Sequence, residues 1–258
     1  MNEPTYTAGV TRYVEAGQAM MAAEAAHRRA MRGKKFDTIA VHGIYGMEAA
    51  LANQGSILEP GYFSSAQHFE NSDHMEAALA YLMPAWTYTR IANPTQHYLE
   101  ETLALLEGYG FQGDASACAT SSGMSAIFMA TNPFLAQEMP DLGSNGHGAK
   151  RINVVASAKC YGGTFMLFSQ RYAAERGVEV RWVRNSLDLS EWASKIDSNT
   201  RFVYGEMPSN PGLAVFDIAA VAGLAHQQDI PLIVDATVAT PALMRPLCYG
   251  ADIVVQSL

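Results

Sequence analysis

The chain has 258 residues, of which 49% are apolar and 16% charged, and its net charge at pH 7 is −8. This composition is typical of a globular protein with one large domain or two smaller ones. The negative charge argues against a nucleic-acid-binding surface. The apolar runs are too short for us to expect a membrane span or a signal peptide. Three widely spaced cysteines, Cys118, Cys160 and Cys248, predict no disulfide framework and a reducing compartment, hence the cytoplasm.

The first third of the chain shows one clear helical pattern. Residues 12–32, rich in Ala, Met and Arg, predict an amphipathic helix that ends at Gly33. This helix fits a peripheral arm or a subunit contact, and it fits a plain surface helix equally well. Residues 36–90 have no clean period and predict an extended segment that packs on something else, such as another subunit. Thr95 is a suitable N-cap for a helix that ends at Gly108.

Beyond that helix, short β-branched runs alternate with helical stretches. Strands are predicted at residues 115–120, 152–156, 178–183, 201–206, 232–235 and 252–256, and helices from Met124 and over 188–196 and 217–228. This alternation predicts βαβ units and a mostly parallel sheet with helices on both faces. Ligands bind beyond the carboxyl ends of the strands in such sheets, so candidate chemistry is expected just after each run. Residues 142–148 predict a flexible surface loop.

Two of these strand ends carry candidate ligand-binding groups. Ser122, Gly123 and Met124 stand at the start of a helix, where free N–H groups and the helix dipole favour an anion such as phosphate. Many small-residue turns simply begin helices, so this feature alone is weak. Tyr161, beside Gly162 and Gly163, is placed to stack on a planar ring. Taken alone, that stretch is more typical of a buried core tyrosine.

Two further strand ends supply an amide and a carboxylate. Asn210 lies between two prolines and either hydrogen-bonds a ligand oxygen or only caps the turn. Asp235 ends an apolar run, and a buried carboxylate needs a cationic partner such as a pyridinium nitrogen, a metal or an arginine. No His or Cys stands near it at metal-ligand spacing, so we predict no metal site. Together these features meet the needs of pyridoxal 5′-phosphate (PLP).

At this point the motifs resemble those of a known family. The segment Tyr88-Thr-Arg90-Ile-Ala-Asn93-Pro94-Thr95 resembles the YSRxxNPT motif of the Cys/Met-metabolism family of PLP-dependent enzymes. That family includes cystathionine γ-synthase, cystathionine and methionine γ-lyases and homoserine-ester sulfhydrylases. The likeness runs in order over residues 36–258, through Ser122-Gly123-Met124, Tyr161-Gly162-Gly163-Thr164, Glu206-Met-Pro-Ser-Asn210-Pro211, Asp235-Ala-Thr and Gly250-Ala-Asp-Ile-Val-Val-Gln-Ser257.

The resemblance implies a fold-type-I PLP enzyme, with an extended segment that contacts the neighbouring subunit (36–95) and an incomplete large PLP-binding domain (96–258). The N-terminal helical arm (1–35) that precedes them has no counterpart in the family. The resemblance also implies a C-terminal domain outside the chain. Tyr88 and Arg90 would bind the PLP phosphate of the neighbouring subunit. The expected assembly is a homo-oligomer, a dimer with shared active sites that forms a tetramer.

The phosphate contacts are implied by the same resemblance. Gly123 and Met124 would donate backbone N–H groups to the phosphate, beside Ser122, and Ser257 would add its hydroxyl. The lysine that binds PLP covalently is expected two positions beyond Leu258.

The contacts to the pyridine ring are implied as well. Tyr161 would stack on the ring and act as an acid toward the leaving group, Asn210 would contact the ring hydroxyl, and Asp235 would pair with the ring nitrogen. Ala236 replaces the Asn that usually follows this Asp, and Gly163 stands where methionine γ-lyases typically have Cys.

The implied reaction is γ-elimination from an amino acid with a leaving group at Cγ, which gives a 2-oxo acid and ammonia. The alternative is γ-replacement, and in either case the leaving group need not be sulfur, as in canavanine. Two other readings are a fold-type-I aminotransferase, which the Tyr88–Thr95 motif disfavours, and a non-enzymatic binding or scaffold protein.

Overall fold

The computed structural model describes residues 6–135 and 152–258, so the loop predicted at 142–148 lies outside the described residues. The chain forms two compact units. The first comprises residues 1–109 and 115–119, and the second comprises residues 110–114 and 120–258.

The first unit begins with the predicted amphipathic helix. Helix α1 (Ala8–Arg32) starts four residues earlier than expected, because the Thr7 hydroxyl caps it by accepting from Val10 N, and it ends at Gly33 as predicted. It packs on α4 (Ser72–Leu79) through a small core that includes Val10, Tyr13 and Ala77. The pattern of residues 12–32 therefore predicted the helix correctly.

The prediction of an extended segment over residues 36–90 is wrong in part. This stretch holds three short helices, α2 (Phe36–His42), α3 (Met47–Ala52) and α4. Helix α2 buries only Ile39 and α3 buries no residue, so neither leaves a hydrophobic period in the sequence.

Helix α5 (Pro94–Glu107) is present, but its cap is not the predicted Thr95. The Asn93 side chain accepts from Thr95 N, and Pro94 occupies the first helical position, where its missing N–H costs nothing.

The predicted strand at 115–120 does not form. Residues 115–119 belong to the first unit, where the Glu100 carboxylate accepts from Ala119 N and the Arg28 guanidinium donates to Ala115 O. Because helix side chains take these backbone groups, the stretch has no strand partner.

The second unit is built on a parallel sheet with the strand order β2-β1-β3-β4-β5. The strands are β1 (Asn153–Ser157), β2 (Glu179–Val183), β3 (Thr200–Glu206), β4 (Leu232–Asp235) and β5 (Ile253–Val255). Every residue of β1 and β4 is buried, as expected for strands covered on both faces.

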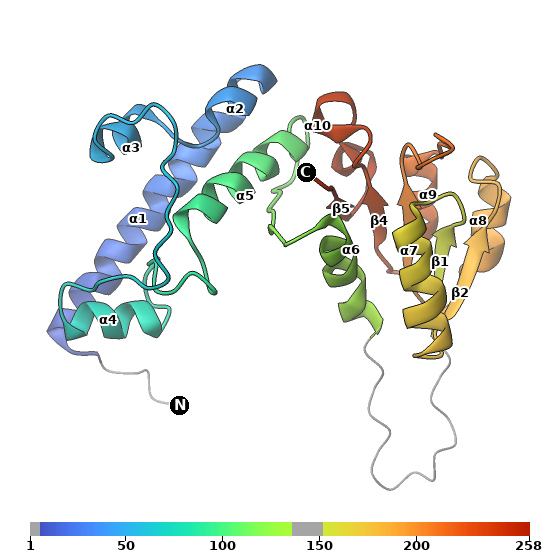
Figure 1. Ribbon diagram of the computed structural model, residues 1–258, viewed down its shortest axis with the longest axis horizontal. Coiled ribbons are helices and arrows are strands. Elements are labelled where there is room, and N and C mark those ends of the chain that lie inside the picture. Colours follow the sequence, from blue (N-terminus) through green and yellow to red (C-terminus); the bar gives the residue numbers. More distant parts are fainter. Residues whose placement is uncertain (1–5, 136–151) are drawn as a thin grey trace, which may run out of the picture. The chain divides into compact units, whose positions relative to one another are not determined.

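Helices cover both faces of this sheet (Figure 1). One face carries α6 (Gly123–Thr131), η1 (Asn132–Leu135), α7 (Gly162–Met166) and the π-helical segment η2 (Leu167–Ala174). The other carries α8 (Leu189–Lys195) and α9 (Ile218–His226). The short elements α10 (Thr240–Leu243) and η3 (Pro246–Tyr249) complete the unit.

Side chains alternate between the two cores along each strand. Phe202 and Tyr204 of β3 point into the core shared with Phe168, whereas Val203 between them points into the core shared with Trp192. The predicted fold class, a parallel sheet with helices on both faces, is confirmed. No helix in the described residues is both long and apolar enough to cross a bilayer.

Candidate functional site

The start of α6 is a candidate anion-binding position at the carboxyl edge of the sheet. The Ser122 hydroxyl caps the helix by accepting from Ser125 N at 3.1 Å, and its own proton can still be donated. The N–H groups of Gly123 and Met124 lie in the first turn, where no intrahelical acceptor exists. A negatively charged group bound here would also be favoured by the helix dipole.

Gly123 lies directly against Ser257, which follows β5. A Cβ placed on Gly123 would lie 2.7 Å from Ser257 Cβ and 3.0 Å from its Oγ. Only glycine therefore allows the Ser257 hydroxyl to reach the start of α6. The structure thus brings together Ser122, Gly123, Met124 and Ser257.

Asp235 is the last residue of β4, and its residue surface is 6% exposed. Its Oδ1 accepts from Thr237 N at 3.0 Å, and the Tyr204 hydroxyl lies 3.4 Å from Oδ2. Among the described residues, no Lys, Arg or His side chain forms an ion pair with this carboxylate. A buried carboxylate without a cation is costly, so the site is suited to a positively charged ligand atom.

Thr237 joins this carboxylate to the anion-binding position. Its N–H is bound to Asp235, and its hydroxyl oxygen accepts from Ser257 N at 2.9 Å. The two charged ends of a ligand would therefore be held by one short stretch of connected backbone.

The groups around Asp235 are themselves held neutral. Burial raises the pKa of Tyr204 well above its ordinary value, and the charge of Asp235 adds to the effect. Burial raises the pKa of Cys160 to about 12, with smaller contributions from Glu206 and Asp235. Tyr204 therefore remains a phenol that can donate to Asp235, and Cys160 remains an unreactive thiol.

Tyr161 is 48% exposed, which contradicts the core tyrosine that its local sequence favours. The residue precedes α7, and a Cβ placed on Gly163 would lie 2.6 Å from Tyr161 Cε1 and 2.9 Å from Met124 Sδ. The ring therefore lies over Gly163, close to the start of α6. A cysteine at position 163 would require the Tyr161 ring or the Met124 side chain to shift.

Glu206 connects Tyr161 with the turn that holds Asn210. Its Oε2 accepts from Tyr161 N at 2.5 Å and its Oε1 accepts from Asn210 N at 2.6 Å. Tyr161 and Asn210 are exposed, and neither side chain has a hydrogen-bond partner within the described residues. An aromatic ring and a free amide thus face solvent at the ends of β1 and β3.

Tyr88 and Arg90 lie in the first unit, and both are exposed. Tyr88 pairs with Ala66 in an isolated antiparallel bridge, and Thr89 N donates to Ser65 O at 3.0 Å. This pairing holds the segment in place while the two side chains remain free to contact a ligand.

The sequence reasoning assigned no role to Glu206, Tyr204 or Thr237. A signal for Glu206 was present, because it ends the apolar run of β3 as Asp235 ends that of β4. Tyr204 and Thr237 left no signal, since their roles depend on contacts with Asp235 that only the fold creates.

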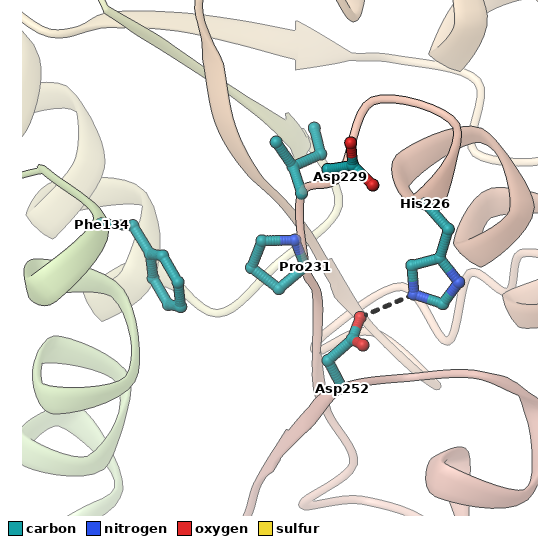
Figure 2. A pocket seen from close by; sticks show the side chains of 6 residues that line it. Phe134, His226, Asp229, Pro231 and Asp252 are labelled. Atoms are coloured by element: carbon teal, nitrogen blue, oxygen red, sulfur yellow. Dashed lines mark hydrogen bonds and ion pairs between the residues drawn. The ribbon is translucent and has the colours of Figure 1, made fainter.

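An open pocket lies at the opposite, amino edge of the sheet (Figure 2). It is lined by Phe134, His226, Asp229, Ile230, Pro231 and Asp252. Asp252 Oδ2 lies 2.9 Å from His226 Nε2 and accepts from Leu232 N at 2.8 Å. These contacts join α9 to the starts of β4 and β5, which indicates a structural role.

The residues at the carboxyl edge fit PLP. Its phosphate matches the start of α6 with Ser257, its flat ring matches the exposed Tyr161, and its ring nitrogen matches the buried Asp235 that has no cationic partner.

Comparison with known proteins points to the same cofactor. Residues 37–258 match the profile of the Cys/Met metabolism PLP-dependent enzyme family. The chain is 36% identical to an O-acetyl-L-homoserine sulfhydrylase of Corynebacterium glutamicum, over 86% of this chain and 46% of the relative. It is 37% identical to an L-methionine gamma-lyase of Pseudomonas deceptionensis, over 86% of this chain and 50% of that relative.

A solved structure agrees with these relatives. The crystal structure of a putative O-acetylhomoserine (thiol)-lyase from Campylobacter jejuni, which carries N′-pyridoxyl-lysine-5′-monophosphate, is similar to this chain with a TM-score of 0.71 and 34% identity. The match covers 87% of this chain and 50% of that one. The chain spans about half the length of the relatives that it matches. By profile, sequence and fold, the chain belongs to the Cys/Met metabolism family of PLP-dependent enzymes, of fold type I.

Proposed function

We propose that the full protein is a PLP-dependent enzyme that carries out γ-elimination on an amino acid with a leaving group at Cγ, giving a 2-oxo acid and ammonia. The observation that supports this most directly is Asp235, a carboxylate 6% exposed at a strand end and without a cationic partner in the described chain. PLP, when bound, supplies an electron-withdrawing ring that stabilises negative charge at Cα of the substrate.

Asp235 is the residue that makes this chemistry effective. Its carboxylate would pair with the ring nitrogen and favour the protonated ring, and the hydrogen bonds from Thr237 N and the Tyr204 hydroxyl orient its two oxygens. The neutral Tyr204 adds no competing charge.

The phosphate would be held by the start of α6. Gly123 and Met124 donate backbone N–H groups, and the hydroxyls of Ser122 and Ser257 complete the set. These contacts carry no chemistry, but they fix the ring over the end of the sheet.

Tyr161 and Asn210 would contact the ring itself. The Tyr161 ring would stack on the pyridine ring, and its phenol would give a proton to the departing group at Cγ. The Asn210 side-chain amide donates to the ring hydroxyl. The lysine that binds PLP covalently lies, on this proposal, outside the 258 residues.

Tyr88 and Arg90 would complete the phosphate site of a neighbouring subunit. Their exposure and their lack of hydrogen-bonded side-chain partners within the described residues support this. We therefore propose a homo-oligomer, a dimer with shared sites that assembles into a tetramer. We also propose a cytoplasmic location, since Cys118, Cys160 and Cys248 form no disulfide with one another in the described residues.

The second candidate is γ-replacement, in which a thiol takes the place of the leaving group. The names of several relatives favour it, because they are O-acetyl- and O-succinylhomoserine sulfhydrylases. A leaving group bound through oxygen, as in homoserine esters or canavanine, suits either reaction.

Two measurements on the full-length gene product test the proposal. The purified protein should show the visible absorption band of PLP bound to a lysine, and borohydride should abolish it. Incubation with candidate amino acids should then release a 2-oxo acid. Formation of the 2-oxo acid without an added thiol supports γ-elimination. If the only product is an amino acid that has gained the added thiol at Cγ, γ-replacement is supported. A protein that binds no PLP would refute both.

A further inference from the structure

Glu206 is a buried carboxylate that the proposed chemistry does not use. It is the last residue of β3, is 4% exposed and has no ion pair within the described residues. Burial raises its pKa, the two backbone hydrogen bonds oppose that rise, and Asp235 adds to it. Burying a carboxylate without a cationic partner lowers the stability of the fold, which indicates that Glu206 has a specific role at this position.

Both of its oxygens bind backbone N–H groups of residues at the candidate site. Oε2 accepts from Tyr161 N at 2.5 Å and Oε1 accepts from Asn210 N at 2.6 Å. Such charge-assisted hydrogen bonds are shorter and stronger than those between neutral groups. One rigid carboxylate thereby fixes the backbone distance between these two residues.

Tyr161 and Asn210 come from different strand ends, and their exposed side chains have no other anchor. Tyr161 follows β1, Asn210 follows β3, and neither side chain has a hydrogen-bond partner in the described chain. Their positions therefore depend on how their backbones are held, which is the role of Glu206.

We propose that Glu206 is a positioning residue that sets the separation between Tyr161 and Asn210 and so defines the slot for the PLP ring. The proposal rests on the proposed function, since it takes Tyr161 as the ring-stacking residue and Asn210 as the partner of the ring hydroxyl. Glu206 itself touches neither cofactor nor substrate, and it acts only through the two backbones that it holds.

The decisive variant is Glu206→Gln, which keeps the length of the side chain. An amide has one acceptor oxygen and one donor nitrogen, so it can satisfy only one of the two N–H groups. Losing a hydrogen bond to a charged group should weaken PLP binding to the full-length apoprotein by roughly ten- to hundredfold. Binding of pyridoxal should weaken by the same factor, because the slot contacts the ring and not the phosphate.

Glu191 provides a matched control in the same unit. Its two oxygens also accept from backbone N–H groups, of Arg184 at 2.9 Å and Asn185 at 2.8 Å, but these residues join β2 to α8 and none of them belongs to the candidate site. Glu191→Gln should lower the melting temperature without changing PLP affinity. It should also leave unchanged the pH titration of the visible PLP band, which Glu206→Gln should shift.

The outcomes separate the two proposals. Wild-type PLP affinity and an unchanged band titration in folded Glu206→Gln would overturn the positioning role and leave the proposed function intact. A wild-type protein that binds no PLP would overturn both. If the Gln variant does not fold, Glu206→Asp replaces it in the same experiment. Aspartate keeps the charge but is shorter by one methylene, so its oxygens lie farther from the two N–H groups and weaker binding of pyridoxal is expected. Unchanged binding of pyridoxal would again refute the positioning role.

Discussion

Asp235→Asn tests the central electrostatic claim with little change of shape. The new side chain can still accept from Thr237 N through its oxygen and can donate to the Tyr204 hydroxyl oxygen. Asp235 is 6% exposed, so water cannot replace the lost charge. The variant should fold and bind PLP, but the ring nitrogen should lose its proton.

The expected magnitude follows from the burial of this residue. Removing one partner of a buried ion pair costs about 3–5 kcal/mol. If that cost falls on the transition state, kcat drops by roughly 10²- to 10⁴-fold, since each 1.4 kcal/mol corresponds to about a factor of ten. The assay is release of 2-oxo acid by the full-length enzyme saturated with PLP.

Asp252→Asn is the matched control at the other edge of the same sheet. It removes a carboxylate that contacts His226 and Leu232 N and leaves the cofactor residues untouched. Its kcat should equal that of the wild type. A loss of less than tenfold in PLP-saturated Asp235→Asn would refute the assignment of Asp235 to the ring nitrogen.

Three further variants test the site and the fold. Gly123→Ala should weaken binding of PLP but not of pyridoxal, measured by titration of the apoprotein, because its Cβ would lie 2.7 Å from Ser257 Cβ. Trp192→Ala should lower the free energy of unfolding by about 3–5 kcal/mol in urea, because this side chain is fully buried. Asp197→Asn should flatten acid unfolding. Desolvation opposes ionisation of Asp197, but hydrogen bonds, first from Arg181, prevail and lower its pKa to about 2. Since the folded pKa lies below the unfolded value, this stabilisation is present above about pH 4 and is lost as the pH falls toward 2.

Two of these variants have a control. Gly223→Ala also adds a methyl to a helix, but into open space on α9, away from the residues proposed to bind PLP, so PLP binding should not change. Trp86→Ala removes a partly exposed indole and should cost far less than Trp192→Ala. If a variant and its control had equal effects, the structural argument for that variant would be contradicted.

The elements that could be predicted from the sequence are those with a strong local pattern. The strands of the second unit, β1 to β5, are rich in β-branched and aromatic residues, and their predicted positions agree with the structure within one residue. The stretch at 115–120 consists mainly of small residues and forms no strand, because Glu100 and Arg28 bind its backbone. The short helices α2 and α3 bury too few residues to leave a pattern.

The sequence by itself determined the kind of site, since residues such as Tyr161 and Asp235 stand at or soon after the ends of strands that meet at one edge of a parallel sheet. Only the tertiary structure decided how they are connected. Thr237 joins Asp235 to Ser257, and Glu206 joins the backbones of two separate loops. These links escape prediction because a hydrogen bond depends on distance and direction in space, which the order of residues along the chain does not specify.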